Sequence, residues 1–131
     1  MTWTARHISR SIDRDPAEVA AFAGDPANLP QWAAGLSTGI RRDGDRWLAE
    51  SPMGDVEVFF PGPVEFGILD HDVTLPDGSR FHNPIRVLRN DHGSEVVFTL
   101  YRMPGVSDED YEADAARIEG DLDELAAILE E

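Results

Sequence analysis

Two histidines lie in a stretch of the chain that is rich in polar side chains. The stretch GILDHDVTLPDGSRFHNPI (67–85) contains His71 and His82 together with three aspartates, an asparagine and an arginine. Imidazole and carboxylate groups bind metal ions and transfer protons. The chain has no cysteine, so a metal site would need histidines and carboxylates alone. Successive side chains of a strand point to opposite faces, so a joint site requires that both histidines face the same side.

Composition limits the class of protein and its partners. With 131 residues and 41% hydrophobic content, we expect a single domain over 1–131 with one core. The net charge of −15 excludes nucleic acid and disfavours anionic membranes as partners, because both carry negative charge. There is neither an apolar run of membrane-spanning length nor a signal-peptide pattern, so we expect a cytoplasmic protein without membrane insertion.

The acidic residues gather at the C-terminus. Residues 107–131 contain 11 acids and one base, Arg117, which is typical of a solvated helix face. An apolar stripe with helical spacing runs through the same segment: Tyr111, Ala115, Ile118, Leu122, Leu125 and Leu129. Ser107 is placed to cap the start of this helix, with Asp110 three residues later. The pattern therefore predicts a long amphipathic helix that needs a large apolar surface to cover.

Strands and short helices are predicted for the rest of the chain. Residues 2–13 alternate as a strand does, and Asp15 before Pro16 starts a short helix that Gly24 ends. A second short helix is expected over 28–36. From residue 37 to 103 the pattern has period two and is interrupted by repeated turn signals, which indicates a meander of antiparallel strands.

The order of these elements resembles that of a known family. The stretch ISRSIDRDPAEVAAFAGDPANLPQW (8–32) is similar to the first strand and two short helices of START-like proteins, in the polyketide cyclase/dehydrase group of the SRPBCC superfamily. The residues that carry this likeness are Ile12, Asp13, Pro16, Val19, Pro30 and Trp32. The resemblance implies an α+β helix-grip fold, in which a curved antiparallel sheet wraps around a long C-terminal helix. This fold hosts carriers, receptors, enzymes and chaperone activators, so it does not by itself identify a function.

The turn at LPDGS determines which way the two histidines point. Pro76 and Gly78 match a three-residue hairpin loop. That loop places His71 opposite Asn83 on an apolar face, and Asp72 opposite His82 on the other face. A two-residue turn would put arginines opposite leucines and is rejected. The next turn, NDHG, independently puts Val87 opposite Val96 and Ile85 opposite Phe98, again on the apolar face. The two histidines are therefore predicted to be separated by the sheet.

Two readings of His71 and Asn83 remain open. In the first, the two buried side chains hydrogen-bond to each other, directly or through water. In the second, they orient a ligand in an apolar cavity. His82 with Asp72 is read as a surface ion pair. No metal site is predicted, because only one histidine faces inward. The residues expected to line a ligand cavity are Trp32, Leu69, His71, Val73, Phe81, Asn83, Ile85, Phe98, Leu100 and Tyr111.

Three functions are compatible with this sequence. The favoured one is a binding protein, monomeric or homodimeric, for a small apolar, aromatic or lipid-like molecule. The second is a cofactor-independent cyclase or dehydratase, with His71 as general acid/base and Asn83 polarising a carbonyl. The third is a protein-interaction domain of the chaperone-activator kind, with the acidic helix as its contact surface.

Overall fold

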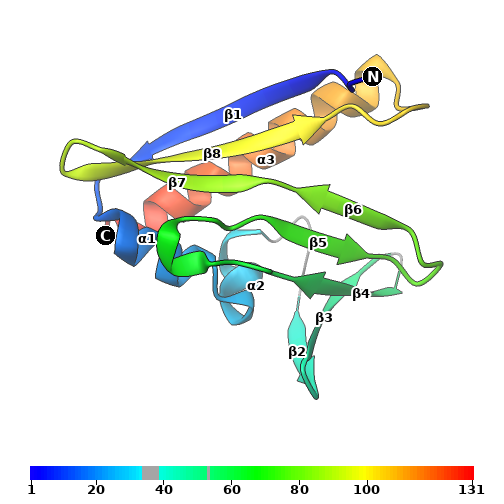
Figure 1. Ribbon diagram of the computed structural model, residues 1–131, viewed down its shortest axis with the longest axis horizontal. Helices are drawn as coiled ribbons and strands as arrows, with labels where there is room; N and C mark the ends of the chain where they lie inside the picture. The colour runs from blue at the N-terminus through cyan, green and yellow to red at the C-terminus, as the bar shows by residue number, and fades with distance from the viewer. Residues whose placement is uncertain (34–38, 53) are drawn as a thin grey trace.

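The computed structural model describes residues 1–33, 39–52 and 54–131. The end of the helix predicted over 28–36 and Met53, within a stretch with predicted turn signals, lie outside these residues. Figure 1 shows strands that form a curved antiparallel surface, with the long helix α3 running along one side of it. The architecture is the α+β arrangement that the sequence predicts.

The strands form two sheets that are joined at β7. The first sheet has the order β1-β8-β7, made of Ala5–Ile12, Gly93–Tyr101 and Ile85–Asn90. The second has the order β2-β3-β4-β5-β6, made of Ile40–Asp43, Arg46–Ser51, Gly54–Phe59, His71–Thr74 and Arg80–Asn83. The Leu69 amide donates to the Ile85 carbonyl at 2.9 Å, so the segment before β5 extends the second sheet onto β7.

Short helices follow β1, as the proline positions predict. Helix α1 covers Pro16–Ala23, and the Asp15 carboxylate accepts a hydrogen bond from the Ala17 amide at 2.9 Å. A 3₁₀ turn η1 at Pro26–Asn28 leads into α2 at Leu29–Trp32. A second 3₁₀ turn, η2 at Val64–Phe66, precedes β5. Asp15 thus satisfies a free amide at the start of α1.

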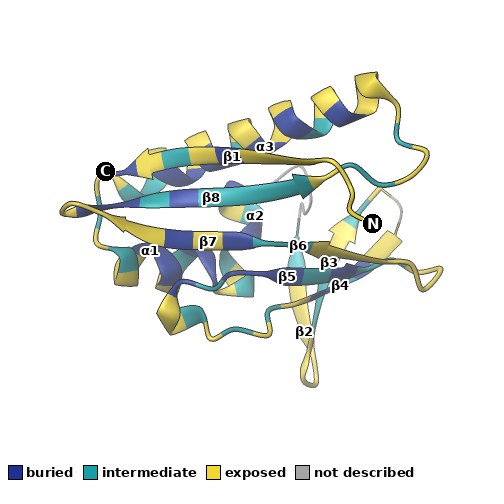
Figure 2. Ribbon diagram, turned by 45° about the horizontal axis from the view of Figure 1, so that its top comes forward, coloured by how far each residue is buried: buried dark blue, intermediate teal, exposed yellow. Residues whose placement is uncertain are grey.

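Helix α3, Asp108–Leu129, covers the inner face of the sheets. The Ser107 hydroxyl caps it by accepting from the Asp110 amide at 3.1 Å, as predicted. Of the predicted stripe, Tyr111, Ala115, Ile118, Leu122 and Leu125 are buried and Leu129 is half-buried. Figure 2 shows the buried stripe on the side of α3 that faces the strands and exposed residues on its outer side. No helix of the described ranges is long and apolar enough to cross a membrane.

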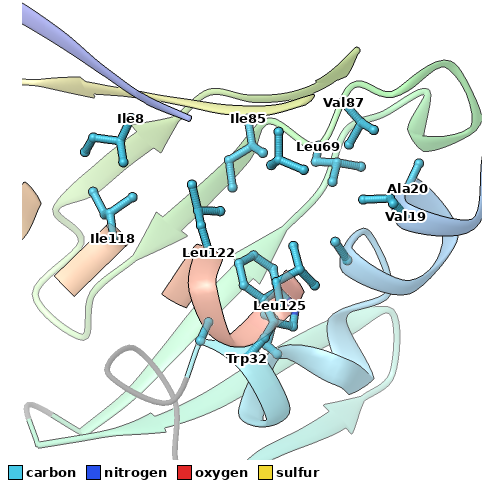
Figure 3. Close-up of a cluster of buried hydrophobic side chains, with 14 of the residues drawn as sticks. Ile8, Val19, Ala20, Trp32, Leu69, Ile85, Val87, Ile118, Leu122 and Leu125 are labelled. Atoms are coloured by element: carbon cyan, nitrogen blue, oxygen red, sulfur yellow. The ribbon is translucent and has the colours of Figure 1, made fainter. Parts of the chain in front are cut away.

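The core lies between α3 and the sheets. Figure 3 shows Ile118 and Leu122 of α3 pointing toward Ile8 of β1 and Ile85 of β7, with Trp32 of α2 below them. Outside this core, Arg6 pairs with Glu112 and Arg10 pairs with Asp123, each at 2.8 Å. The ion pairs join β1 to α3 along the free edge of the first sheet.

Candidate functional site

The β5–β6 hairpin has the predicted loop and register. The Leu75 amide donates to the Ser79 carbonyl at 2.8 Å, and Gly78 has a φ of +91°, which glycine adopts without strain. His71 pairs with Asn83 and Asp72 pairs with His82 in the strand ladder. The two histidines therefore lie on opposite faces of the sheet, and the prediction of separate environments is confirmed.

His82 belongs to a charged cluster on the outer face. Its Nδ1 lies 2.7 Å from an Asp72 oxygen, and its side chain is 52% exposed. Beside it, Arg86 donates two hydrogen bonds to Asp70, at 3.0 and 2.8 Å, and the Ile85 amide donates a third at 3.0 Å. The hydrogen bonds from Arg86 are the main reason why the pKa of Asp70 is lowered. This cluster supports the hairpin and faces away from the core.

His71 is buried and uncharged. Its side chain stacks on Phe60, with ring centroids 5.0 Å apart and planes 23° apart. Burial lowers the pKa of His71, so the imidazole is neutral at neutral pH. Its Nδ1 lies 3.2 Å from the Leu69 carbonyl oxygen, which only accepts, so Nδ1 carries the proton. The second nitrogen, Nε2, is therefore a hydrogen-bond acceptor.

A cavity of about 80 Å³ lies between the sheets, α2 and α3. Most of its walls are apolar, and its polar side chains come from the hairpin and from α3. The lining residues are Leu29, Trp32, Ala33, His71, Asn83, Ile85, Phe98, Leu100, Arg117, Ile118, Asp121 and Leu122. An apolar pocket with a few convergent polar groups is the usual form of a small-molecule site.

The structure brings together six of the ten residues predicted to line a cavity: Trp32, His71, Asn83, Ile85, Phe98 and Leu100. The other four lie elsewhere. Leu69 and Val73 are buried in the core, and Tyr111 is buried with its hydroxyl donating to the Leu100 carbonyl at 3.3 Å. Phe81 is on the predicted face but is 41% exposed. Strand parity gives the face of a side chain and not whether a helix covers it.

Sequence reasoning missed the two charged residues of the cavity, Arg117 and Asp121. Both were assigned to the solvated face of the acidic helix. Each directly precedes a stripe residue, Ile118 or Leu122, and this position at the border of the stripe was the available signal. Burial raises the pKa of Asp121 to about 6, although Arg117, at 3.8 Å, acts in the opposite direction.

Comparison with known proteins identifies the fold. The solution structure of the Aha1 dimer from Colwellia psychrerythraea matches with a TM-score of 0.74 at 12% identity, over 97% of this chain and 96% of the other. DynU16, a protein of the dynemicin biosynthetic locus, matches with a TM-score of 0.70 at 17% identity, over 96% of this chain and 47% of DynU16. Ara h 8.0201 matches with a TM-score of 0.64 at 11% identity, over 96% and 97%. The chain has the helix-grip fold.

Sequence comparison adds little to this result. No protein-family model matches the chain. Transmembrane protein 131 of Mus musculus is 35% identical over 69 residues, which are 46% of this chain and 4% of that protein. The chain thus spans a small fraction of this curated relative. The likeness to solved structures concerns the fold, so the function has to be argued from the cavity.

Proposed function

We propose that this protein binds a small apolar or aromatic molecule in the cavity between its sheets and α3. One observation carries the proposal: an apolar cavity whose polar groups, His71, Asn83, Arg117 and Asp121, come from two different parts of the fold. No hydrogen bond joins His71 to Asn83 among the described residues, so this pair does not satisfy itself directly. Both side chains are free to orient a ligand, and binding needs no cofactor.

Separate substitutions of the two histidines test this proposal. Thermal-shift screening of aromatic, steroid-like and fatty-acyl compounds identifies a ligand, and calorimetry then compares three variants. His71→Ala and Asn83→Ala should weaken binding by about 1 to 3 kcal/mol, because each removes a polar partner inside the cavity. His82→Ala is the matched control and should leave binding unchanged, since His82 lies on the other face.

Two results would contradict the proposal. Equal losses for His71→Ala and His82→Ala would mean that the ligand does not contact the cavity side of the hairpin. Failure of every compound to bind would favour the protein-interaction alternative, in which the exposed acidic face of α3 is the contact surface.

A catalytic role of the same cavity is the second candidate, and the state of His71 favours it. A neutral imidazole with a free Nε2 is the form required of a general base. The reaction class that suits a base beside an amide is a cyclisation or dehydration, with Asn83 polarising a carbonyl. His71→Ala should then lower the chemical rate by about 10²- to 10⁴-fold, while His82→Ala stays active. A rate unchanged by His71→Ala would exclude this role.

A further inference from the structure

The size of the cavity limits the ligand to a single ring. Its volume is about 80 Å³. Drug-sized ligands occupy pockets of about 300 to 1,000 Å³, whereas a cavity of about 150 Å³ is enough to hold benzene. Several walls are core residues that are about 1% exposed: Leu29, Ile85 and Leu122. A steroid or a long acyl chain would have to displace them, and displacing a packed core is costly. The cavity is smaller than one that holds benzene, so even one ring requires an outward shift of a wall residue, and Phe98 and Arg117 are two that are partly exposed.

The cavity side of the hairpin offers an acceptor that has no partner. Among the described side chains, Trp32 Nε1 is a buried polar atom that has no hydrogen-bond partner. His71 Nε2 also has no hydrogen-bond partner among them, and His71 lines the cavity. Because Nδ1 carries the proton, Nε2 can only accept. A ligand bound here needs a hydrogen-bond donor.

Asn83 provides a hydrogen-bond donor beside this acceptor. It pairs with His71 in the ladder, which puts both side chains next to each other on one face. No hydrogen bond involves its side chain among the described residues, and its amide group can donate as well as accept. An acceptor beside a donor matches a hydroxyl group, which donates one hydrogen bond and accepts another.

The charges at the opposite wall favour a neutral ligand. Arg117 lies 3.8 Å from both Asp114 and Asp121, so its charge is balanced by two carboxylates of its own helix. An anion would be repelled by Asp121 in the cavity wall and by the net charge of −15. Most of the remaining wall is apolar, so burying any charged ligand there, cation or anion, is costly, and a neutral molecule avoids this cost.

We propose that the cavity takes a phenol: a neutral single ring whose hydroxyl group donates to His71 Nε2 and accepts from the Asn83 amide, with the ring between Trp32, Ile85 and Leu122. This inference rests on the proposed binding function and names its ligand class. A phenol is uncharged at neutral pH, because its pKa is about 10.

Four ligands of similar size separate the contributions of the ring, the hydroxyl group and a negative charge to binding. Phenol, anisole, toluene and benzoate are titrated at pH 7.5 into the full chain, with binding followed by NMR shifts of the amides next to the cavity. Phenol should bind at least about tenfold more tightly than toluene, since only phenol satisfies the Nε2 acceptor. Anisole keeps the oxygen but has no donor, so it should bind as toluene does. Benzoate should not bind.

His71→Phe tests the named contact. Phenylalanine keeps a flat ring against Phe60 but has no acceptor, so phenol affinity should fall about tenfold to the level of toluene, while toluene affinity is unchanged. His82→Phe adds the same ring on the outer face and should change neither affinity. If His71→Phe does not fold, the affinities of the unaltered protein for phenol and anisole still show whether a ligand donor is required.

The outcomes distinguish this inference from the proposed function. Equal affinity for phenol, anisole and toluene overturns the role of His71 Nε2. Binding of a steroid or fatty acid but of none of the four rings overturns the ligand class and leaves the proposed function standing. If no compound of either kind binds, both proposals fail.

Discussion

Asp121 and His71 line the same cavity, and burial favours the neutral form of each. The consequences for stability have opposite signs. The pKa of Asp121 is raised to about 6, so the folded state keeps a proton that the unfolded state releases near pH 3.8. Its favourable contribution is present below pH 3.8 and is lost as the pH rises through about 6. The pKa of His71 is lowered from 6.5, so its contribution is present above pH 6.5 and is lost as the pH falls.

Asp121→Asn should isolate the first of these effects. The amide mimics the neutral carboxyl, so the variant should be more stable than the original protein at pH 8, on the order of 1 kcal/mol. The gain should disappear toward pH 4, where the original carboxyl is itself protonated. Urea unfolding at both pH values measures the difference. Asp123→Asn is the control: it removes an exposed acid that pairs with Arg10, so it should give no gain at pH 8.

The β5–β6 hairpin shows how much of an element can be predicted from sequence. Pro76, Gly78 and the alternation of side chains fix its loop and register, because turn geometry and strand parity are local properties. The same local reasoning correctly separates His71 from His82. The capped start of α3 and its apolar stripe are also local, and both are confirmed.

The parts of the site that sequence did not predict depend on distances between elements. Phe81 has the right parity but is exposed, since parity does not say where the cover of the sheet ends. Arg117 and Asp121 are within an acidic run, and only the gap between α3 and the sheets makes them part of a cavity. The volume of that gap depends on how side chains of six elements, α2, β5, β6, β7, β8 and α3, pack together, which no single segment encodes.

The junction between the two sheets depends on one glycine. Gly67 has a φ of +82°, and a Cβ atom there would lie 2.4 Å from the Val87 carbonyl oxygen. Gly67→Ala should therefore destabilise the protein through an unfavourable φ, at about 1 to 2 kcal/mol, and through a backbone clash that adds about 1 to 3 kcal/mol. Chemical denaturation gives the total change in the free energy of unfolding.

Gly78→Ala separates these two costs. Gly78 also has a positive φ, +91°, but nothing lies within 4 Å of the position of its Cβ. Only the cost of the unfavourable φ should appear in this variant. If the two alanine variants lose the same stability, the close approach of Gly67 to β7 does not constrain the junction.

The whole molecule carries far more negative than positive charge, and several of its arginines form ion pairs with acidic residues. Arg6 and Arg10 of β1 contact Glu112 and Asp123 of α3, and Arg14 donates to the Leu129 carbonyl at the end of the same helix. The two ion pairs of β1 are exposed, so each contributes little to stability. The remaining acids repel one another, and a net charge of −15 destabilises a compact chain.

Salt should therefore stabilise this protein. Raising NaCl from 0.01 to 0.5 M shortens the Debye length from about 30 Å to well below 10 Å, which screens the long-range repulsion more than it weakens close ion pairs. The melting temperature should rise over this range. Glu124→Gln removes an exposed acid that forms none of the ion pairs found among the described residues, so this variant should melt higher at low salt and respond less to NaCl. A melting temperature that falls with salt would mean that the ion pairs between β1 and α3 outweigh the repulsion, and Arg10→Ala would then remove most of that dependence.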